Sequence, residues 1–267
     1  MAVVIDIDDP GDPRVADFRD LSAADRRPDR PGGRGLVLAE GVVVVQRMLT
    51  SRFAPFALFG VERRYEQLAG DLAGVDVPYY RASAEVMAEV VGFHLNRGVL
   101  AAARRPAEPD PARLLATART VAVLEGVNDH ENIGSIFRNA AGLGADAILF
   151  GDRCADPLYR RAVRVSMGHV LRVPFATLPT WPDSLELLRD TGFRIIALTP
   201  DPAAATLAAA LTGDRVALLL GAEGPGLTAA AMTASDVRAR IPMSAGTDSL
   251  NVATAAAMAF YERVRAS

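Results

Sequence analysis

Short apolar runs alternate with amphipathic stretches over residues 36–102. Apolar runs bounded by turn residues are typical of strands, and apolar positions that recur every three or four residues are typical of helices. The expected strands are 36–39, 56–61, 77–80 and 98–102, and the expected helices are 41–49, 64–72 and 84–91. This pattern predicts a compact α/β sandwich in the first part of the chain.

The flanks of this series are patterned differently. After an apolar start at 3–5, an acidic, proline-containing stretch is expected to hold an amphipathic turn or helix ending near Leu21, followed by a polar loop at 22–35. Residues 104–113 carry three prolines among charged side chains, a composition typical of interdomain linkers. We therefore expect a front domain at 1–105, a linker at 106–117 and a second domain at 118–267.

A second alternating series fills the remainder of the chain. It opens with a nearly continuous apolar run at 121–127, which is typical of a strand buried on both faces. The expected strands are 121–127, 147–150, 173–175, 194–198 and 216–220, and the expected helices are 133–142, 157–167, 184–191 and 252–264. Such alternation predicts a parallel sheet covered by helices on both sides.

Composition and charge limit the function classes. Half of the 267 residues are apolar, yet no run approaches the roughly 18 needed to span a membrane, and the acidic start does not resemble a secretory signal. We therefore expect a cytoplasmic protein. One cysteine, Cys154, excludes an internal disulfide, and with three histidines beside it we expect no dedicated zinc site and no other metal.

The net charge of −3 argues against nucleic-acid binding, which usually shows as a basic surplus. All 29 basic residues are arginine. This usage is explained either by a GC-rich coding bias or by the suitability of arginine for phosphate and stacking contacts. Five arginines within twenty residues predict either a local basic face or an ordinary solvated helix surface. They are Arg153, Arg160, Arg161, Arg164 and Arg172.

Three loops at the ends of expected strands hold most of the unusual polar residues of the second domain. Ligands bind at such loops in open α/β sheets. The loops are 128–145, with Asn132, Gly134 and Arg138; 218–227, with Gly221, Glu223, Gly224 and Gly226; and 241–258, with Ser249 and Asn251. Taken singly, Asn132 or Ser249 is explained equally by helix capping, and the glycines by an ordinary turn. A GxGxxG dinucleotide fingerprint and a GK[ST] phosphate loop are both absent.

Together the three loops closely resemble the signature motifs of the SpoU (TrmH-like) RNA 2′-O-ribose methyltransferases. The motifs are Asn132-x-Gly134-x-x-x-Arg138, Gly221-x-Glu223-Gly224-x-Gly226-Leu227, and Ile241-Pro242-Met243 followed seven residues later by Leu250-Asn251-Val252. The stretch YRRAVRVSMGHVLRVPF at 159–175 is similar to the family sequence between the first two motifs. LVLAEGVVVVQRML and NRGVLAAARRP are similar to the start and end of the L30e-like RNA-binding domain of many members.

The resemblance, which covers roughly residues 120–264, implies a SPOUT α/β domain tied in a deep trefoil knot, preceded by a small L30e-like α/β domain. It also implies S-adenosylmethionine as cofactor and a homodimer whose active site draws on both chains. The implied cofactor-binding residues are Gly221, Glu223, Gly224, Ile241, Met243, Leu250 and Ala253, and the implied catalytic residues are Arg138, Asn132, Glu223, Ser249 and Asn251.

Chemistry supports a central role for Arg138. Methylating a ribose hydroxyl requires a poor nucleophile to lose its proton, and a fixed guanidinium stabilises the developing alkoxide. Because arginine holds its proton so strongly, we favour electrostatic activation over a role as general base, with phosphate or water taking the proton. Asn132, Glu223, Ser249 and Asn251 would position Arg138 and the ribose.

The sequence therefore predicts a methyltransferase acting on RNA, with 23S rRNA favoured over tRNA because of the front domain. Two further classes are open: an inactive RNA-binding homologue, disfavoured by the intact motifs, and a nicotinamide-dependent oxidoreductase, disfavoured by the missing fingerprint. The sequence does not name the nucleotide, nor decide between ribosome maturation and antibiotic resistance.

Overall fold

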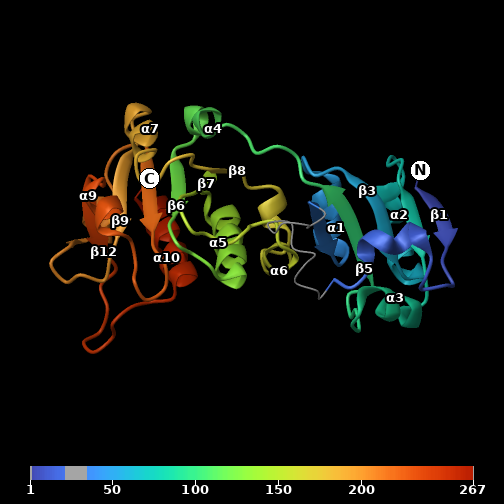
Figure 1. Cartoon of the computed structure of the whole chain (residues 1–267). Coiled ribbons are helices and arrows are strands. Elements are labelled where there is room, and N and C mark those ends of the chain that lie inside the picture. Colours follow the sequence, from blue (N-terminus) through green and yellow to red (C-terminus); the bar gives the residue numbers. More distant parts are fainter. Residues whose placement is uncertain (1, 22–34, 267) are drawn as a thin grey trace. The chain divides into compact units, whose positions relative to one another are not determined.

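The computed structural model describes residues 2–21 and 35–266, and the expected polar loop at 22–35 lies almost entirely outside them. The chain forms two compact units (Figure 1). Unit 1 consists of Met1–Pro106 and Asp156–Arg172, and unit 2 of Ala107–Ala155 and Val173–Ser267. No helix in the described ranges is long and apolar enough to cross a membrane.

Unit 1 is built on a five-stranded mixed sheet in the order β1-β4-β3-β5-β2. Its strands are β1 (Val3–Asp6), β2 (Leu36–Glu40), β3 (Pro55–Gly60), β4 (Pro78–Arg81) and β5 (Val99–Arg104). Its helices before residue 106 are η1 (Pro13–Phe18), α1 (Val42–Leu49), α2 (Glu62–Leu72) and α3 (Ala84–Val91). Phe18 of η1 and Met87 of α3 pack on Phe59 in one buried cluster. The predicted α/β sandwich is present, and the expected helix near Leu21 is a short 3₁₀ helix.

The segment 156–172 packs with unit 1, although we expected it in the domain at 118–267. It contains α6 (Arg160–Val165), shorter than the expected helix at 157–167, and η3 (His169–Leu171). Arg160 Nη1 donates to the buried Glu40 Oε2 at 2.8 Å, and Arg105 pairs with buried Asp156. Gly168, at φ +82°, lies so close to α1 that a Cβ would be 3.1 Å from Val44 Cγ1. These contacts join two stretches that are distant in sequence.

The expected linker at 106–117 contains helix α4 (Pro111–Thr117). Asp110 caps it by accepting from the Ala112 N–H at 2.9 Å, and Pro111 occupies the first turn, where no N–H is needed. Leu115 is completely buried in the core of unit 2. Pro111 therefore starts a packed helix of unit 2, and only the part of the expected linker before this helix is left to join the two units at this crossing.

Unit 2 is built on a seven-stranded sheet in the order β10-β12-β9-β11-β6-β7-β8. All its strand pairs are parallel, as predicted. The strands are β6 (Thr120–Leu124), β7 (Ala147–Phe150), β8 (Phe175–Thr177), β9 (Arg194–Leu198), β10 (Ala205–Thr206), β11 (Val216–Leu220) and β12 (Val237–Arg240). Strand β12 ends at Arg240, just before Ile241, where the third loop begins.

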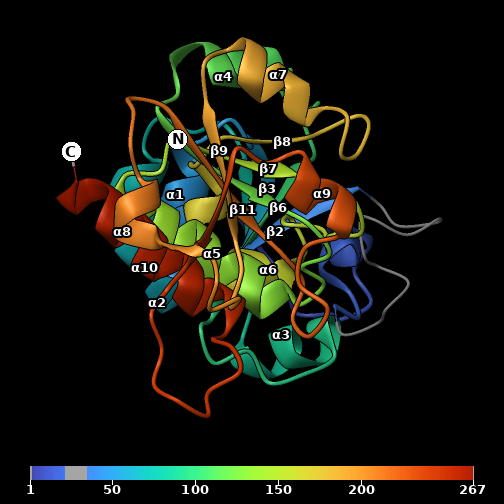
Figure 2. The same cartoon turned by 90° about the vertical axis from the view of Figure 1, so that its left-hand side faces the viewer.

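Helices cover both faces of this sheet (Figure 2). The helices are α4, α5 (His130–Leu143), α7 (Leu185–Asp190), α8 (Leu207–Ala210), α9 (Ala229–Thr233) and α10 (Val252–Arg265). Leu115 of α4, Leu188 of α7 and Ala231 of α9 bury one face. On the other face, Phe137 of α5 packs against Phe150 and Phe175.

The connections leave two neighbouring strands in opposite directions. From β6 the chain runs through α5 to β7, whereas from β11 it runs through α9 to β12, on the far side of β9. Strands β6 and β11 pair in parallel from Val216 and Thr120 to Leu220 and Leu124. A reversal of this kind opens a crevice at the carboxyl ends of the two strands, where ligands bind in open α/β sheets.

Candidate active site

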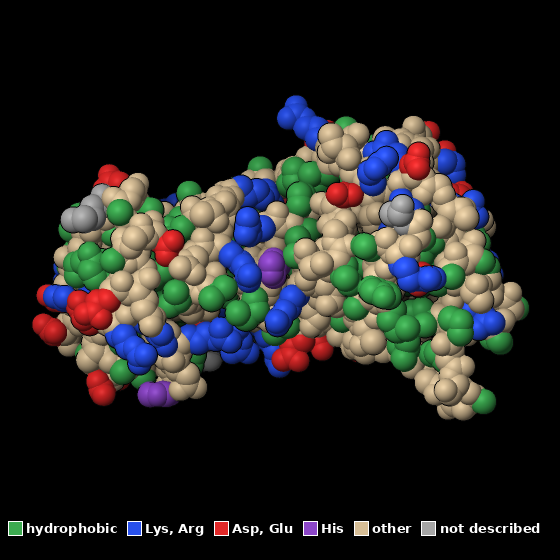
Figure 3. Space-filling model, turned by 180° about the vertical axis from the view of Figure 1, so that it is seen from behind, with side chains coloured by type: hydrophobic (Ala, Val, Ile, Leu, Met, Phe, Trp, Pro, Cys, Tyr) green, Lys and Arg blue, Asp and Glu red, His purple; other side chains and the backbone are tan. Residues whose placement is uncertain are grey.

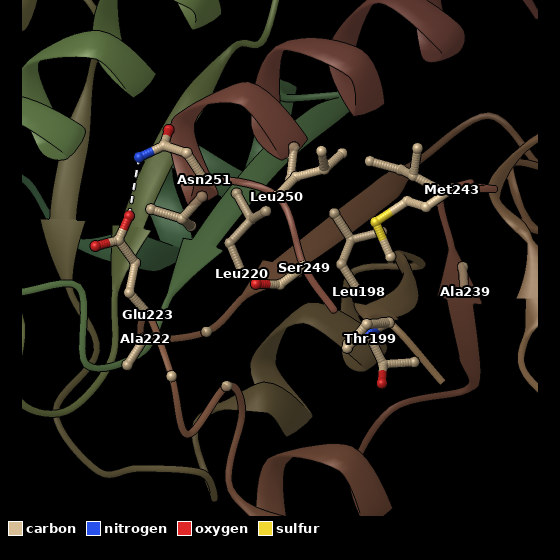
Figure 4. Close-up of a pocket in the computed structure, with 17 residues that line it drawn as sticks. Leu198, Thr199, Leu220, Ala222, Glu223, Ala239, Met243, Ser249, Leu250 and Asn251 are labelled. Carbon is tan, nitrogen blue, oxygen red and sulfur yellow. Dashed lines mark hydrogen bonds between the residues drawn. The ribbon is translucent and has the colours of Figure 1, made fainter. Parts of the chain in front are cut away.

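A cavity of about 270 Å³ lies at the carboxyl ends of β9, β11 and β12 (Figure 4). Its walls come from the loops that follow these strands and from the start of α10. The lining residues are Leu198, Thr199, Pro200, Leu220, Gly221, Ala222, Glu223, Gly224, Gly226, Ala239, Ile241, Met243, Ser249, Leu250, Asn251, Val252 and Ala255. Mostly apolar walls with few polar groups are typical of a small-molecule site.

The glycines of the second loop serve different purposes. Gly224 and Gly226 have φ of +88° and +70°, values that favour glycine. A Cβ on Gly221 would overlap the backbone of Gly226 and Leu227, so this glycine lets the loop close on itself. A larger residue at 221 would therefore disturb the loop before it touched any ligand.

Three predicted catalytic side chains form one hydrogen-bonded cluster at the rim of the cavity. Asn132 Nδ2 and Asn251 Nδ2 both donate to Glu223 Oε1, at 3.0 and 2.8 Å. Asn251 Nδ2 also lies 2.8 Å from Asn132 Oδ1. Figure 4 shows Glu223 and Asn251 facing each other across the cavity rim. The cluster joins residues from all three loops.

Helix capping explains one member of this cluster. Asn251 is the N-cap of α10, because its Oδ1 accepts from the N–H groups of Ala253 and Thr254 at 3.0 and 3.1 Å. The cap of α5 is Asp129, which accepts from the Glu131 N–H at 2.7 Å. Neither Asn132 nor Ser249 is a cap, so the capping alternative fails for both.

Arg138 and Ser249 lie outside the cluster. Arg138 is exposed on α5 and makes no hydrogen bond or ion pair with any residue that the structure describes. Ser249 is exposed and lines the cavity. The structure therefore brings Asn132, Glu223 and Asn251 together and leaves Arg138 directed to solvent.

Of the expected cofactor-binding residues, only Ala253 does not line the cavity. It is buried on α10, and its carbonyl accepts from Asn139 Nδ2 at 3.0 Å. One wall of the cavity was not predicted from the sequence: it is formed by Leu198, Thr199 and Pro200, which follow β9. Because β9 was an expected strand, the loop at its carboxyl end was the signal that could have found them.

A buried carboxylate braces the second loop. Glu125, only 1% exposed, accepts from Trp181 Nε1 at 2.5 Å and from the Thr228 N–H at 2.8 Å. Trp181 lies directly on Gly151, where a Cβ would overlap its ring. The sequence analysis did not single out Glu125, whose position directly after β6 was the available signal.

The five clustered arginines are divided between the units, because Arg153 belongs to unit 2 and the others to unit 1. Arg160 is committed to Glu40 and also lies over the Phe93 ring at 4.8 Å. Arg161 and Arg172 are exposed. The chain contains no lysine, so every blue side chain in Figure 3 is an arginine.

Comparison with known sequences gives a consistent family. Residues 119–261 match the SpoU rRNA Methylase family. An uncharacterized tRNA/rRNA methyltransferase of Mycobacterium bovis is 68% identical over 265 residues, which cover 98% of this chain and 92% of that protein. The 23S rRNA (guanosine(2553)-2′-O)-methyltransferase of Bacillus subtilis is 32% identical over 57% of this chain and 60% of its own length.

Solved structures share the fold over nearly the whole chain. An rRNA methyltransferase from Sinorhizobium meliloti with bound AdoMet superposes with a TM-score of 0.80 at 24% identity, covering 98% of both chains. An RNA methyltransferase of the TrmH family from Porphyromonas gingivalis gives a TM-score of 0.77 at 25% identity, covering 95% of this chain and 97% of that one. The chain belongs to the SpoU family, whose members are RNA methyltransferases that use S-adenosylmethionine.

Proposed function

We propose that this protein transfers a methyl group to a ribose 2′-hydroxyl of 23S ribosomal RNA. The observation that carries the proposal is the cluster of Asn132, Glu223 and Asn251, which fixes three family motifs at the rim of one cavity. Related proteins from Bacillus subtilis and Streptomyces azureus are named 23S rRNA 2′-O-methyltransferases. These names support both the ribose and the ribosomal part of the proposal.

The cavity suits S-adenosylmethionine in the character of its walls. Leu198, Leu220 and Ile241 offer apolar surface for an adenine ring, and the backbone of the closed glycine loop offers polar groups without bulky side chains. Met243 and Leu250 extend this apolar surface, while Glu223 and Ser249 supply the polar groups. When bound, the cofactor supplies a methyl group carried on a sulfonium.

The residues of this chain then have distinct roles. Arg138 would stabilise the ribose oxygen as this oxygen loses its proton to a phosphate oxygen or to water and accepts the methyl group that the cofactor would supply. Asn132 and Asn251 hold the Glu223 carboxylate in place. Ser249, at the wall of the cavity, contacts the ribose.

The finer fold assignments complete the proposal. We assign residues 1–105 to an L30e-like RNA-binding domain and residues 118–267 to a SPOUT domain with a deep trefoil knot. The full-length structural similarity supports both assignments. Because ribosomal RNA is the proposed substrate, we also assign the protein to the cytoplasm.

We further propose a homodimer formed through α10. Three apolar side chains on this helix, at intervals of three residues, are exposed: Met258 by 42%, Tyr261 by 58% and Val264 by 55%. Helices α5 and α10 are joined by the bond from Asn139 to the Ala253 carbonyl. A second copy covering α10 would thus lie beside the helix that carries Arg138. Light scattering should report a dimer for the wild type and a monomer for Tyr261→Arg.

The proposed activity is tested by mapping 2′-O-methyl groups in rRNA and tRNA from cells with and without the gene. One 23S rRNA position should lose its methyl group in the deletion strain and regain it when purified protein and labelled S-adenosylmethionine are added to the extracted RNA. A methyl group lost only from tRNA would identify tRNA, and not 23S rRNA, as the substrate. Transfer to a base would contradict the ribose assignment.

A further inference from the structure

A second cavity, of about 300 Å³, lies on the other side of the glycine loop. It occupies the crevice between the carboxyl ends of β6 and β11, where the chain leaves the sheet in opposite directions. Its lining residues are Glu125, Gly126, Asn128, Arg153, Ala222, Pro225, Gly226, Leu227 and Thr228. Ala222 and Gly226 also line the first cavity, so the glycine loop is a wall shared by the two.

The lining of the second cavity combines a buried hydrogen-bond acceptor, apolar surface, an exposed amide and an exposed cation. The Glu125 carboxylate is buried, and each of its oxygens already accepts one hydrogen bond. Pro225 and Leu227 contribute apolar surface. Asn128 is exposed, and its side-chain amide has no hydrogen-bond partner among the residues that the structure describes.

Arg153 stands at an exposed position with an unfavourable backbone conformation. Its φ is +56°, in the left-handed region where glycine or asparagine is less strained than arginine. Its ion pair with Asp152, at 3.3 Å, joins side chains that are 64% and 59% exposed, so it contributes little to stability. The folded chain alone therefore gives no reason for an arginine here, and strained residues of this kind concentrate at functional sites.

We propose that this second cavity receives a nucleobase of the RNA at the methylation site, with Arg153 pairing with the adjoining phosphate. The proposal rests on the proposed function, because a ribose presented to the first cavity places its own or a neighbouring base beside the shared glycine loop. The apolar surface of Pro225 and Leu227 packs against the base, and Asn128 bonds its polar edge. Base amino groups can donate to the remaining lone pairs of Glu125, while the phosphate stays at the rim with Arg153.

Two variants test this assignment in the full-length protein. Arg153→Gly removes the guanidinium and relieves the positive φ, and Asn128→Leu replaces the amide by an apolar side chain of similar size at an exposed position. The probe is total RNA from cells that lack the gene, titrated with labelled S-adenosylmethionine at saturation. Each variant should raise the KM for RNA at least tenfold and leave cofactor affinity unchanged. The melting temperature of Arg153→Gly should be unchanged or raised.

The matched control is Arg238→Ala, which removes an exposed arginine of unit 2 that lines neither cavity. It should leave the KM for RNA within twofold. An Arg153→Gly variant with wild-type KM, or an Asn128→Leu variant that loses cofactor affinity in parallel with RNA affinity, would overturn the proposal. If the wild type transfers no methyl group, the proposed function fails, and filter binding of the same RNA to the variants still decides the role of the cavity.

Discussion

The family motifs contain two groups of residues with different surroundings in the structure. One group is the cluster of Asn132, Glu223 and Asn251, and the other is Arg138 alone. The first three are tied together by hydrogen bonds of 2.8–3.0 Å. Arg138 lies further along α5 than Asn132. Its side chain is exposed and has no hydrogen-bond or ion-pair partner among the described residues. The cluster is complete within one folded chain, whereas the proposed role of Arg138 is an interaction with RNA.

Under the proposed mechanism, this difference separates residues that shape the site from a residue that acts on the substrate. A clustered amide or carboxylate is held before the substrate arrives, so the protein meets the cost of ordering it during folding. An exposed guanidinium loses its side-chain freedom only when an RNA phosphate or a second subunit binds it. Substitutions in the two groups should therefore affect different measurements.

The largest effect is expected when residues 1–112 are removed, although this segment contains none of these four residues. A chain beginning at Arg113 would keep the cluster and Arg138 but expose Ala162, Val163 and Leu171, which are buried in the full chain. We expect a poorly soluble protein, because burial of this apolar surface is lost. A monodisperse truncated protein in size-exclusion chromatography, with native cofactor affinity, would show that residues 156–172 fold without the first part of unit 1.

Arg138→Ala gives the next effect and the sharpest separation between the two groups. We expect the single-turnover transfer rate to fall at least about a hundredfold, the usual scale for losing one charge-stabilising group. The melting temperature and cofactor affinity should not change, since Arg138 makes no contact that they depend on. Arg138→Lys keeps the charge without the planar fork, so its rate distinguishes a charge effect from bidentate positioning. Near wild-type transfer by Arg138→Ala at saturating donor and RNA would refute the mechanism.

Glu223→Gln should have an intermediate effect. The glutamine Oε1 can still accept from Asn132 and Asn251, but charge-assisted hydrogen bonds are about twice as strong as neutral ones. We expect the transfer rate to fall about tenfold while stability falls by roughly 1 kcal/mol. Thermal unfolding and single-turnover kinetics measure the two effects. A hundredfold rate loss without any loss of stability would instead give Glu223 a direct role in methyl transfer, as proposed for Arg138.

Asn139→Ala serves as the control for the cluster, because Asn139 is a neighbouring amide on α5 that lines neither cavity. It donates to the Ala253 carbonyl at 3.0 Å. Its loss should cost about 1 kcal/mol of stability and change the transfer rate less than twofold. A rate loss similar to that of Glu223→Gln would mean that any weakening of the contact between α5 and α10 impairs catalysis.

The smallest effect on methyl transfer is expected from alkylation of Cys154, the residue that follows Arg153. Burial raises the pKa of the Cys154 thiol to about 11. An unfolded cysteine ionises near pH 8.5, so the folded state should lose stability as the pH rises from about 8.5 towards 11. At pH 8 alkylation by iodoacetamide should be far slower than for free cysteine, since the thiolate is the nucleophile. Rapid alkylation, or transfer lost on alkylation, would contradict this.

The sequence predicted the elements whose pattern is strong and local. Continuous apolar runs such as those of β6 and β11 gave strands of a parallel sheet, and the three motifs identified Asn132, Glu223 and Asn251. It missed α8, α9 and β12, because alanine-rich turns and the charged strand Val237–Arg240 carry little periodic signal. The placement of 156–172 in unit 1 depends on contacts such as Arg160 with Glu40, between residues distant in sequence.

The self-contact of the glycine loop has a consequence for protein engineering. Gly221 packs against the backbone of Gly226 and Leu227. The shape of this loop therefore depends on contacts between its own two ends and on the hydrogen bond from the Thr228 N–H to Glu125. A transplant of the proposed cofactor site into another parallel α/β scaffold would therefore need residues 221–228 as one block, together with a buried acid after the adjoining strand. Recombination breakpoints inside the block should yield chimeras that fold but bind no methyl donor, whereas breakpoints on either side of it should be tolerated.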